Sequence, residues 1–264
     1  HVGVLAGAHR DEVPPGAEVA GYHDPGLGIV GQHRACGLAG LFGLTCALAL
    51  AGIAVVIWWV PPEPTQHANA PRGRLLDVWK HADLLRLNLG VFVLHTVQLA
   101  MWVAVPAMLV QAGLPKAAHW HVYLPAVVLS FLAMGGLFAL ERRGQLRAAL
   151  LGAIALVLAV QIGLGLLAGT GSAPTLWVLG GVLFVFFCGF NALEASQPSL
   201  VSRMAPASLR GAALGTYNTL QSLGLFAGGA LGVPALFGVT SALCALWLVL
   251  GWGLRPVGRS SGGH

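Results

Sequence analysis

Two titratable side chains, His95 and Glu194, lie well inside the long apolar runs of this sequence. Ionisable groups at membrane depth are costly, and they usually face a helix-bundle interior or a water-filled path. A histidine changes its charge near neutral pH. His95 is therefore a candidate proton site. The alternative is a neutral histidine held by a hydrogen bond.

Polar residues recur around His95 at helical spacing. Asn88, His95, Gln98 and Trp102 are separated by 7, 3 and 4 residues, which puts them on one face of a helix. A polar stripe of this kind lines a cavity or makes hydrogen bonds between helices. The sequence leaves both roles open.

A second polar patch occurs near the C-terminus. Tyr217, Asn218 and Gln221 lie within four residues of one another, so one helical face can carry all three. The two patches together supply six candidates for the lining of a cavity, namely His95, Gln98, Trp102, Tyr217, Asn218 and Gln221.

The same segment is rich in glycine. Gly211 and Gly215, and then Gly224, Gly228 and Gly232, repeat at intervals of four residues. Small residues at this spacing let two membrane helices approach closely. A tightly packed helix with one polar patch suits a moving element, although static packing would also explain the glycines.

Motifs for other chemistry are absent from the sequence. It has no phosphate-binding glycine loop, no HExxH and no Cys/His metal spacing, so neither a cofactor nor a metal is expected. His119, Trp120 and His121 are typical of an aromatic anchor at the membrane surface rather than of a metal site. Ser172 has no convincing His or Asp partner, which argues against a nucleophilic enzyme.

The composition defines the elements that must position these residues. Of 264 residues, 56% are hydrophobic and 9% are charged, against about a quarter charged in soluble domains. The expected partner is the lipid bilayer rather than nucleic acid. Helices satisfy their own backbone groups in lipid, so the spans should be α-helical. The fold class is an all-α polytopic membrane protein with seven candidate spans, 37–60, 87–110, 121–140, 148–168, 175–196, 211–232 and 235–254.

Basic residues support this number of spans. From residue 37 onwards, eleven of the twelve Lys and Arg residues fall on alternate connections, and Lys116 is the exception. Cytoplasmic loops of inner-membrane proteins carry such an excess. The pattern predicts a cytoplasmic C-terminus, including the tail 256–264, and a cytoplasmic loop at 61–86.

Two segments lie outside the spans. Within the 61–86 loop, GRLLDVWKHADLLRL has apolar residues near helical spacing, which predicts an amphipathic helix; a solvated linker is the alternative. Residues 1–36 contain Pro-Pro and several charges and lack a spanning run. We expect this segment to be an irregular extension, either foreign or frameshifted sequence joined to the fold or a true extracellular tail.

Four stretches carry a family resemblance. They are LNLGVFVLHTVQLAMWVAVP at 87–106, ALERRGQLR at 139–147, FNALEASQPSLVSRMAP at 190–206 and GAALGTYNTLQSLGLFAGGALG at 211–232. The sequence resembles the major facilitator superfamily, in particular the drug/proton antiporter branch with its YajR-like members. The resemblance covers residues 40–255, and Glu141 stands where the family's loop motif usually has Asp.

The resemblance implies that 37–60 is the sixth helix of a twelve-helix transporter and that 87–255 is its C-terminal six-helix bundle. The chain would then lack the first five helices, and with them the opposite wall of the substrate cavity. It implies proton-coupled efflux of a small molecule rather than catalysis, with a matching N-terminal half as a partner. The alternatives are a non-transporting membrane protein or inert fragment, and a seven-helix receptor.

The position of Glu194 in its span indicates a structural role. It lies 19 residues into the span beginning at residue 175, which is roughly 28 Å from the outer end. That position is the cytoplasmic edge, where Pro198 would end the helix. We expect Glu194 to hold the loop to neighbouring helices and Asn191 to make a hydrogen bond between helices. The structural and gating candidates are Glu141, Arg142, Arg143, Asn191, Glu194, Arg203 and Arg210.

Overall fold

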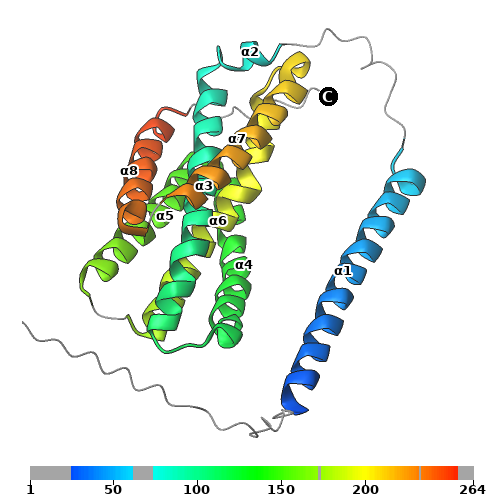
Figure 1. The fold of residues 1–264 in the computed structure, drawn as a ribbon. Coiled ribbons are helices and arrows are strands. Elements are labelled where there is room, and N and C mark those ends of the chain that lie inside the picture. Colours follow the sequence, from blue (N-terminus) through cyan, green and yellow to red (C-terminus); the bar gives the residue numbers. More distant parts are fainter. Residues whose placement is uncertain (1–24, 62–73, 172–173, 232, 255–264) are drawn as a thin grey trace, which may run out of the picture. The chain divides into compact units, whose positions relative to one another are not determined.

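The computed structural model describes residues 25–61, 74–171, 174–231 and 233–254, and these residues form helices and their connections without a strand. The all-α fold class is therefore confirmed (Figure 1). The chain divides into two units, His1–Ala68 and Asn69–His264. The helices are α1 (Pro25–Trp59), α2 (Leu75–Val78), α3 (Ala82–Gln111), α4 (Trp120–Arg142), α5 (Leu146–Gly169), α6 (Leu176–Met204), α7 (Arg210–Ala230) and α8 (Val233–Gly251).

Helix α1 belongs to the first unit, and its apolar side chains are distributed around its whole circumference. It begins at Pro25, so the later part of the segment expected to be irregular is helical. Residues 1–24, the rest of that expected extension, lie outside the described residues. Its stretch Ala39–Trp59 is long and apolar enough to cross a membrane.

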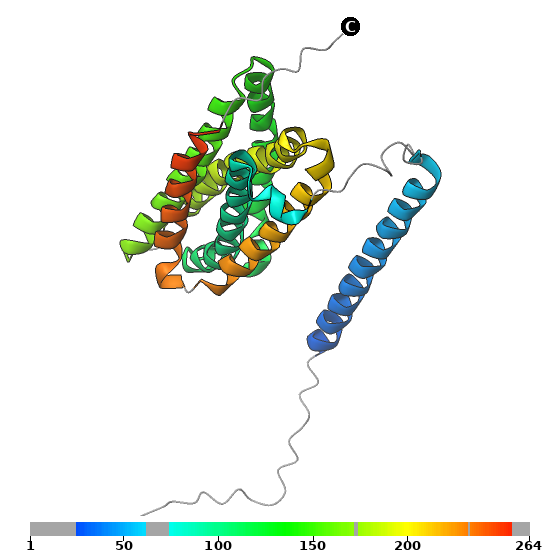
Figure 2. The ribbon, with the colours of Figure 1, turned by 90° about the horizontal axis from the view of Figure 1, so that it is seen from above.

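In the second unit, α3 is the central helix. It packs against α6, α7 and α8, while α4 and α5 pack against α6, and α5 also packs against α8 (Figures 1 and 2). Apolar side chains of α3 are buried over most of its length, from Leu84 to Leu109. Four helices of this bundle, α3 to α6, contain stretches long and apolar enough to span a membrane. Helix α8 is apolar but shorter, and α7 carries the glycines and polar residues.

Several helix ends differ from the expected spans. Helix α3 begins at Ala82 rather than at residue 87. Helix α6 continues to Met204 and contains Pro198 in its interior, so the expectation that Pro198 ends this helix is wrong. Proline removes one backbone donor without preventing the chain from following helical dihedral angles. Packing of α6 against α3, α4, α5 and α7 offsets that loss.

The expected amphipathic helix of the 61–86 loop is also corrected. Only α2 is helical before a break at Trp79–His81, and α3 starts immediately after it. Val78 is buried, whereas Leu75 and Leu76 are exposed. A hydrogen bond from Lys80 to Asp77 lowers the pKa of the Asp77 carboxyl. Residues 62–73 of the loop and the tail 255–264 lie outside the described residues.

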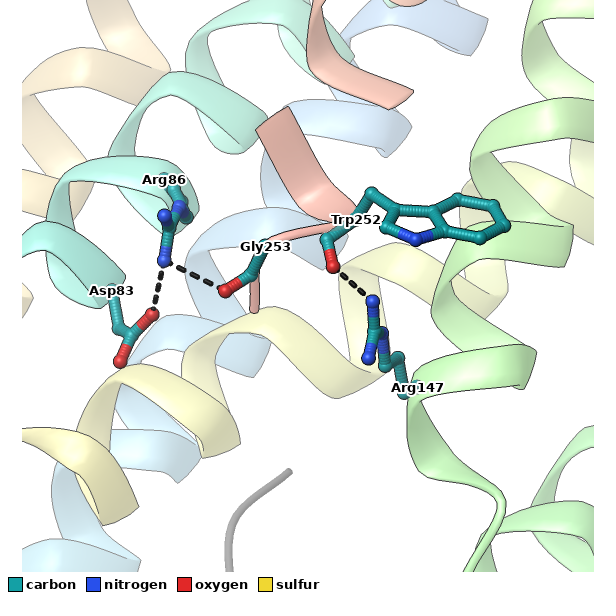
Figure 3. Close-up of polar contacts among 5 residues, drawn as sticks. All are labelled: Asp83, Arg86, Arg147, Trp252 and Gly253. Atoms are coloured by element: carbon teal, nitrogen blue, oxygen red, sulfur yellow. Dashed lines mark hydrogen bonds and ion pairs between the residues drawn. The ribbon is translucent and has the colours of Figure 1, made fainter. Parts of the chain in front are cut away.

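Two arginines fix the C-terminal end of α8 (Figure 3). Arg86 donates to the Gly253 carbonyl at 2.8 Å and to Asp83 at 2.7 Å. Arg147 donates to the Trp252 carbonyl and lies over the Trp252 ring, with 5.7 Å between its Cζ and the ring centroid. Carbonyls at a helix C-terminus lack intrahelical partners and carry partial negative charge, so guanidinium groups stabilise them. These contacts bring the starts of α3 and α5 to the end of α8.

The glycines of α7 divide into two groups. A Cβ at Gly224 or Gly228 would collide with the backbone carbonyl of Phe92 or Thr96 on α3, so these two glycines allow the close helix approach expected of them. Gly211 and Gly215 have no neighbouring atom within 4 Å of such a Cβ among the described residues. Gly232 lies outside the described residues.

Candidate functional site

His95 and Glu194, the two titratable side chains inside the apolar runs, lie close together in the bundle. His95 Nε2 lies 3.4 Å from Glu194 Oε2, which joins the middle of α3 to α6. The His95 side chain is 3% exposed, whereas the Glu194 side chain is 39% exposed. Glu194 therefore directs one buried oxygen at the histidine while the rest of its side chain reaches the surface of the bundle.

The other ring nitrogen of His95 determines how many protons the pair holds. Nδ1 lies 2.9 Å from the Val91 carbonyl, which can only accept, so Nδ1 carries a hydrogen. In the neutral ring, Nε2 then presents a lone pair to Glu194. The contact becomes attractive when one proton is added, either on the imidazole or on the carboxyl.

Aromatic rings surround this pair. The His95 and Phe190 rings meet edge to face, with centroids 6.1 Å apart and an interplanar angle of 69°. Phe190 in turn stacks on Phe186 at 5.6 Å. These rings give His95 an apolar surrounding on the side that faces Phe190.

Glu194 is not at the edge of its helix. Ten residues of α6 follow it, from 194 to 204, which is about 15 Å of helix. The sequence placed Glu194 at the cytoplasmic edge from its distance of roughly 28 Å to the outer end of the span, and α6 begins at Leu176, so this distance is unchanged. The partly exposed Glu194 side chain lies level with His95.

The polar stripe of α3 passes from the core to the surface. Asn88 and His95 are buried, Gln98 is half-buried and Trp102 is exposed. Trp102 stacks on Tyr123 of α4 with ring centroids 5.2 Å apart and an interplanar angle of 17°. The four residues share one helical stripe but have different environments, so only Gln98 and Trp102 have surface available for a substrate.

The polar patch of α7 also divides. Tyr217 is 2% exposed and lies within electrostatic reach of Glu194. Asn218 is exposed and Gln221 is half-buried. The three residues therefore do not share one environment, although they are neighbours in sequence. Tyr217 belongs with the His95–Glu194 pair, and the other two are accessible.

The structural candidates have varied positions. Asn191 donates to Ser130 Oγ at 2.8 Å, which is the hydrogen bond between helices expected of it. Arg210 donates to the Ser202 carbonyl at 2.9 Å and so closes the turn between α6 and α7. Arg143 and Arg203 are exposed. The side chains of Glu141 and Arg142 lie outside the described part of the chain.

Sequence reasoning missed two buried glutamines. Gln161 of α5 accepts a hydrogen bond from Thr240 of α8 at 2.9 Å, and both side chains are fully buried. Gln197 of α6 is 1% exposed and lies one turn beyond Glu194. The position of each glutamine inside an apolar run was the signal in the sequence that could have identified these two residues. Within the described ranges, no three His, Cys, Asp or Glu side chains form a group that could hold a metal.

The sequence of the bundle that contains the His95–Glu194 pair is similar to those of known proteins. The sequence profile of the Major Facilitator Superfamily matches residues 34–229. The chain belongs to the major facilitator superfamily. The apolar spans and the packed helices of the bundle are those of a membrane protein of this superfamily.

Two known proteins are similar to the chain in sequence. The inner membrane transport protein YajR of Escherichia coli (strain K12) is 33% identical over 237 residues, covering 85% of this chain and 51% of YajR. An uncharacterized transporter of Buchnera aphidicola is 25% identical over 201 residues, covering 73% of this chain and 50% of that protein. The chain therefore spans about half the length of the curated relatives it matches.

Proposed function

We propose that this chain forms one half of a bacterial inner-membrane transporter that exports a small molecule in exchange for protons. Membership of the superfamily and the similarity to an inner membrane transport protein support the transport class. The match to half of each relative supports a matching N-terminal half as the partner. Substrate sites in such transporters lie between two halves that rock against each other.

The observation that carries proton coupling is the contact between His95 and Glu194. With one proton bound, the pair links α3 to α6 by an attractive contact. Without it, the lone pair on Nε2 faces a carboxylate and the link is lost. Proton binding therefore changes the strength of a contact between two helices, which is what coupling to a conformational change requires.

The partly exposed groups near the pair would meet the substrate. Gln98, Trp102, Asn218 and Gln221 offer amide hydrogen-bonding groups and one aromatic surface. This combination suits a small amphipathic molecule, since binding sites pair apolar surface with a few polar groups. No covalent bond changes in this function, so the chain is proposed as a transporter and not as an enzyme.

The proposed orientation rests on charge. Arg86, Arg147 and Arg210 lie at the starts of α3, α5 and α7, and the first two contact the end of α8. A concentration of arginine at one end of the bundle is typical of the cytoplasmic side. We therefore assign that end, and the C-terminus, to the cytoplasm.

The test compares Glu194→Gln with the parent chain, each co-expressed with the N-terminal half of YajR and reconstituted in proteoliposomes. A pH-sensitive dye in the lumen reports proton flux driven by a panel of amphipathic aromatic cations, with Glu194→Asp as the conservative control. We expect Glu194→Gln to lower proton flux by at least roughly tenfold, because general proton-transfer groups contribute factors of this order or more. Glu194→Asp should retain part of the flux.

Two results would contradict the proposal. Unchanged flux in a well-folded Glu194→Gln protein would exclude the pair from coupling. A loss of folding with no selective effect on flux would return Glu194 to the structural role expected from the sequence. If the unmutated chain with the N-terminal half of YajR supports no flux with any substrate tested, the chain is better described as a non-transporting membrane protein. Ligand-dependent signalling without flux would favour a receptor.

A further inference from the structure

Three buried side chains on the helices around the His95–Glu194 pair carry polar atoms without a hydrogen-bond partner among the described residues. They are Asn88 on α3, Gln197 on α6 and Tyr217 on α7, each no more than 2% exposed. The unpartnered atoms are Asn88 Oδ1, both polar atoms of the Gln197 amide, and the Tyr217 hydroxyl, together with Glu194 Oε2. The three helices pack against one another.

These atoms lie on one side of the pair. Gln197 is one turn closer than Glu194 to the end of α6, and Asn88 is two turns closer than His95 to the start of α3. Tyr217 is in the second turn of α7. The start of α3, the end of α6 and the start of α7 share one end of the bundle, because α2 contacts both α7 and the turn Ala207–Leu209. We call this the α2 end.

The backbone adds a further acceptor at the same place. Pro198 lies inside α6 and has no N–H, so it cannot donate to the carbonyl four residues earlier, which is that of Glu194 itself. The Glu194 backbone carbonyl therefore receives no helical hydrogen bond from residue 198. Glu194 Oε2 also has no hydrogen-bond partner among the described residues.

The chemistry of the unpartnered atoms selects their partner. Buried polar atoms are hydrogen-bonded in about nine of ten cases, to protein or to ordered water. A metal cation would satisfy the oxygens of Asn88, Glu194 and Tyr217, but it would not satisfy the Gln197 Nε2 donor. Water both donates and accepts, so water can bond to every atom of the set.

We infer that ordered water bound by Asn88, Gln197 and Tyr217 forms a path that carries the proton between the His95–Glu194 pair and the α2 end. This inference rests on the proposed function, since it identifies the route by which that function exchanges its proton. The transfer is balanced. A water molecule takes the proton from the pair as another water passes a proton onward, and no group is oxidised or reduced.

The three residues are positioning residues, because they hold water and do not carry the proton through covalent change. Tyr217 of α7 lies within electrostatic reach of Glu194. Other titratable or charged groups on the described helices around α3 and α6 are Asp83, Arg86, His121, Tyr123, Arg147, Cys188, Arg203, Arg210 and Cys244.

Infrared spectroscopy of the full chain in phosphatidylcholine nanodiscs tests the path without requiring transport. The C=O stretching band of protonated Glu194, identified by its loss in Glu194→Gln, is followed after transfer from H₂O to D₂O at a pH low enough for the band to be present. The variants are Gln197→Met and Asn88→Leu, which replace amides by apolar side chains of similar size, and Tyr217→Phe. Gln161→Met is the matched control, because Gln161 is equally buried and also has an unpartnered Nε2 but lies between α5 and α8.

We expect Gln197→Met and Asn88→Leu to slow the exchange of the Glu194 proton by roughly tenfold, which corresponds to about 1.4 kcal/mol in the barrier. Gln161→Met should leave the rate unchanged. Circular dichroism verifies that each variant is folded, and if Gln197→Met fails to fold, Asn88→Leu and Tyr217→Phe decide the result.

Unchanged exchange in the path variants would overturn the inference, as would equal slowing by Gln161→Met. A change in the exchange rate of the Glu194 proton when choline replaces sodium in the buffer would also overturn the inference, because a cation would then occupy the site. The proposed function can fail separately. If the proposed function fails, Glu194→Gln leaves the proton flux intact. If only the water path fails, Gln197→Met and Asn88→Leu exchange the Glu194 proton as fast as the unmutated chain, and the flux still depends on Glu194.

Discussion

Replacing Gly224 by alanine tests the close approach of α7 to α3. A Cβ at this position would lie 3.2 Å from the Phe92 Cα and closer still to the Phe92 carbonyl oxygen. That oxygen also accepts the hydroxyl of Thr96 at 2.7 Å. The clashing atoms belong to a helix backbone, so relief requires the two helices to separate rather than a side chain to rotate.

The magnitude follows from two opposing terms. Overpacking an interior costs about 1–3 kcal/mol. Alanine regains about 0.5–1 kcal/mol over glycine within a helix. Gly224→Ala should therefore destabilise the bundle by up to about 2.5 kcal/mol, with a central value of about 1 kcal/mol. Gly228→Ala, which meets the Thr96 carbonyl, should behave in the same way, and the double variant should cost less than the sum because one helix displacement relieves both clashes.

Gly215→Ala is the control on the same helix. No atom lies within 4 Å of a Cβ built there, so only the helix-propensity gain remains and the change should be neutral or stabilising. Unfolding of the chain in lipid bicelles, followed by circular dichroism during titration with a denaturing detergent, measures both variants. Equal shifts for Gly224→Ala and Gly215→Ala would refute the close packing of α7 on α3.

Two further substitutions test polar contacts. Arg86→Gln removes the bond to the Gly253 carbonyl, so the last turn of α8 should exchange its amide hydrogens faster, and the bundle should lose about 1 kcal/mol; unchanged exchange there would contradict the cap. Asn191→Ala removes the hydrogen bond to Ser130, which should cost about 0.6 kcal/mol, the average for such bonds in membranes. Ser130→Ala should add little to Asn191→Ala when stability is measured in a double-mutant cycle.

The helices were predictable from the sequence because a bilayer imposes long apolar runs. The all-α class, the span 87–110 and a close helix approach at Gly224 and Gly228 follow from composition and spacing, whereas their partner helix α3 does not. Helix ends were not predictable in the same way. Pro198 was expected to end α6, but tertiary packing keeps the chain helical for six more residues, from 198 to 204. Local signals for breaks are weaker than packing on several sides.

The site was only partly predictable, since periodicity identifies a face but not what lies opposite it. The spacing of Asn88 and His95 correctly put both on one buried face of α3. Nothing in the sequence pairs His95 with Glu194, because the two are 99 residues apart, from 95 to 194. The same limit explains Gly90, where the Trp247 ring of α8 lies against the glycine.

The error over Pro198 bears on function. Because α6 continues past Pro198, about 15 Å of helix separates Glu194 from the α2 end. Glu194 has one oxygen buried against His95, and the rest of its side chain reaches the surface of the bundle. A proton that leaves the pair through the bundle interior toward that end passes the interface where α3, α6 and α7 pack together. Gln197 is the first polar side chain along α6 in that direction whose atoms lack hydrogen-bond partners, so it is the residue whose replacement most directly separates a conducting interior from a merely packed one.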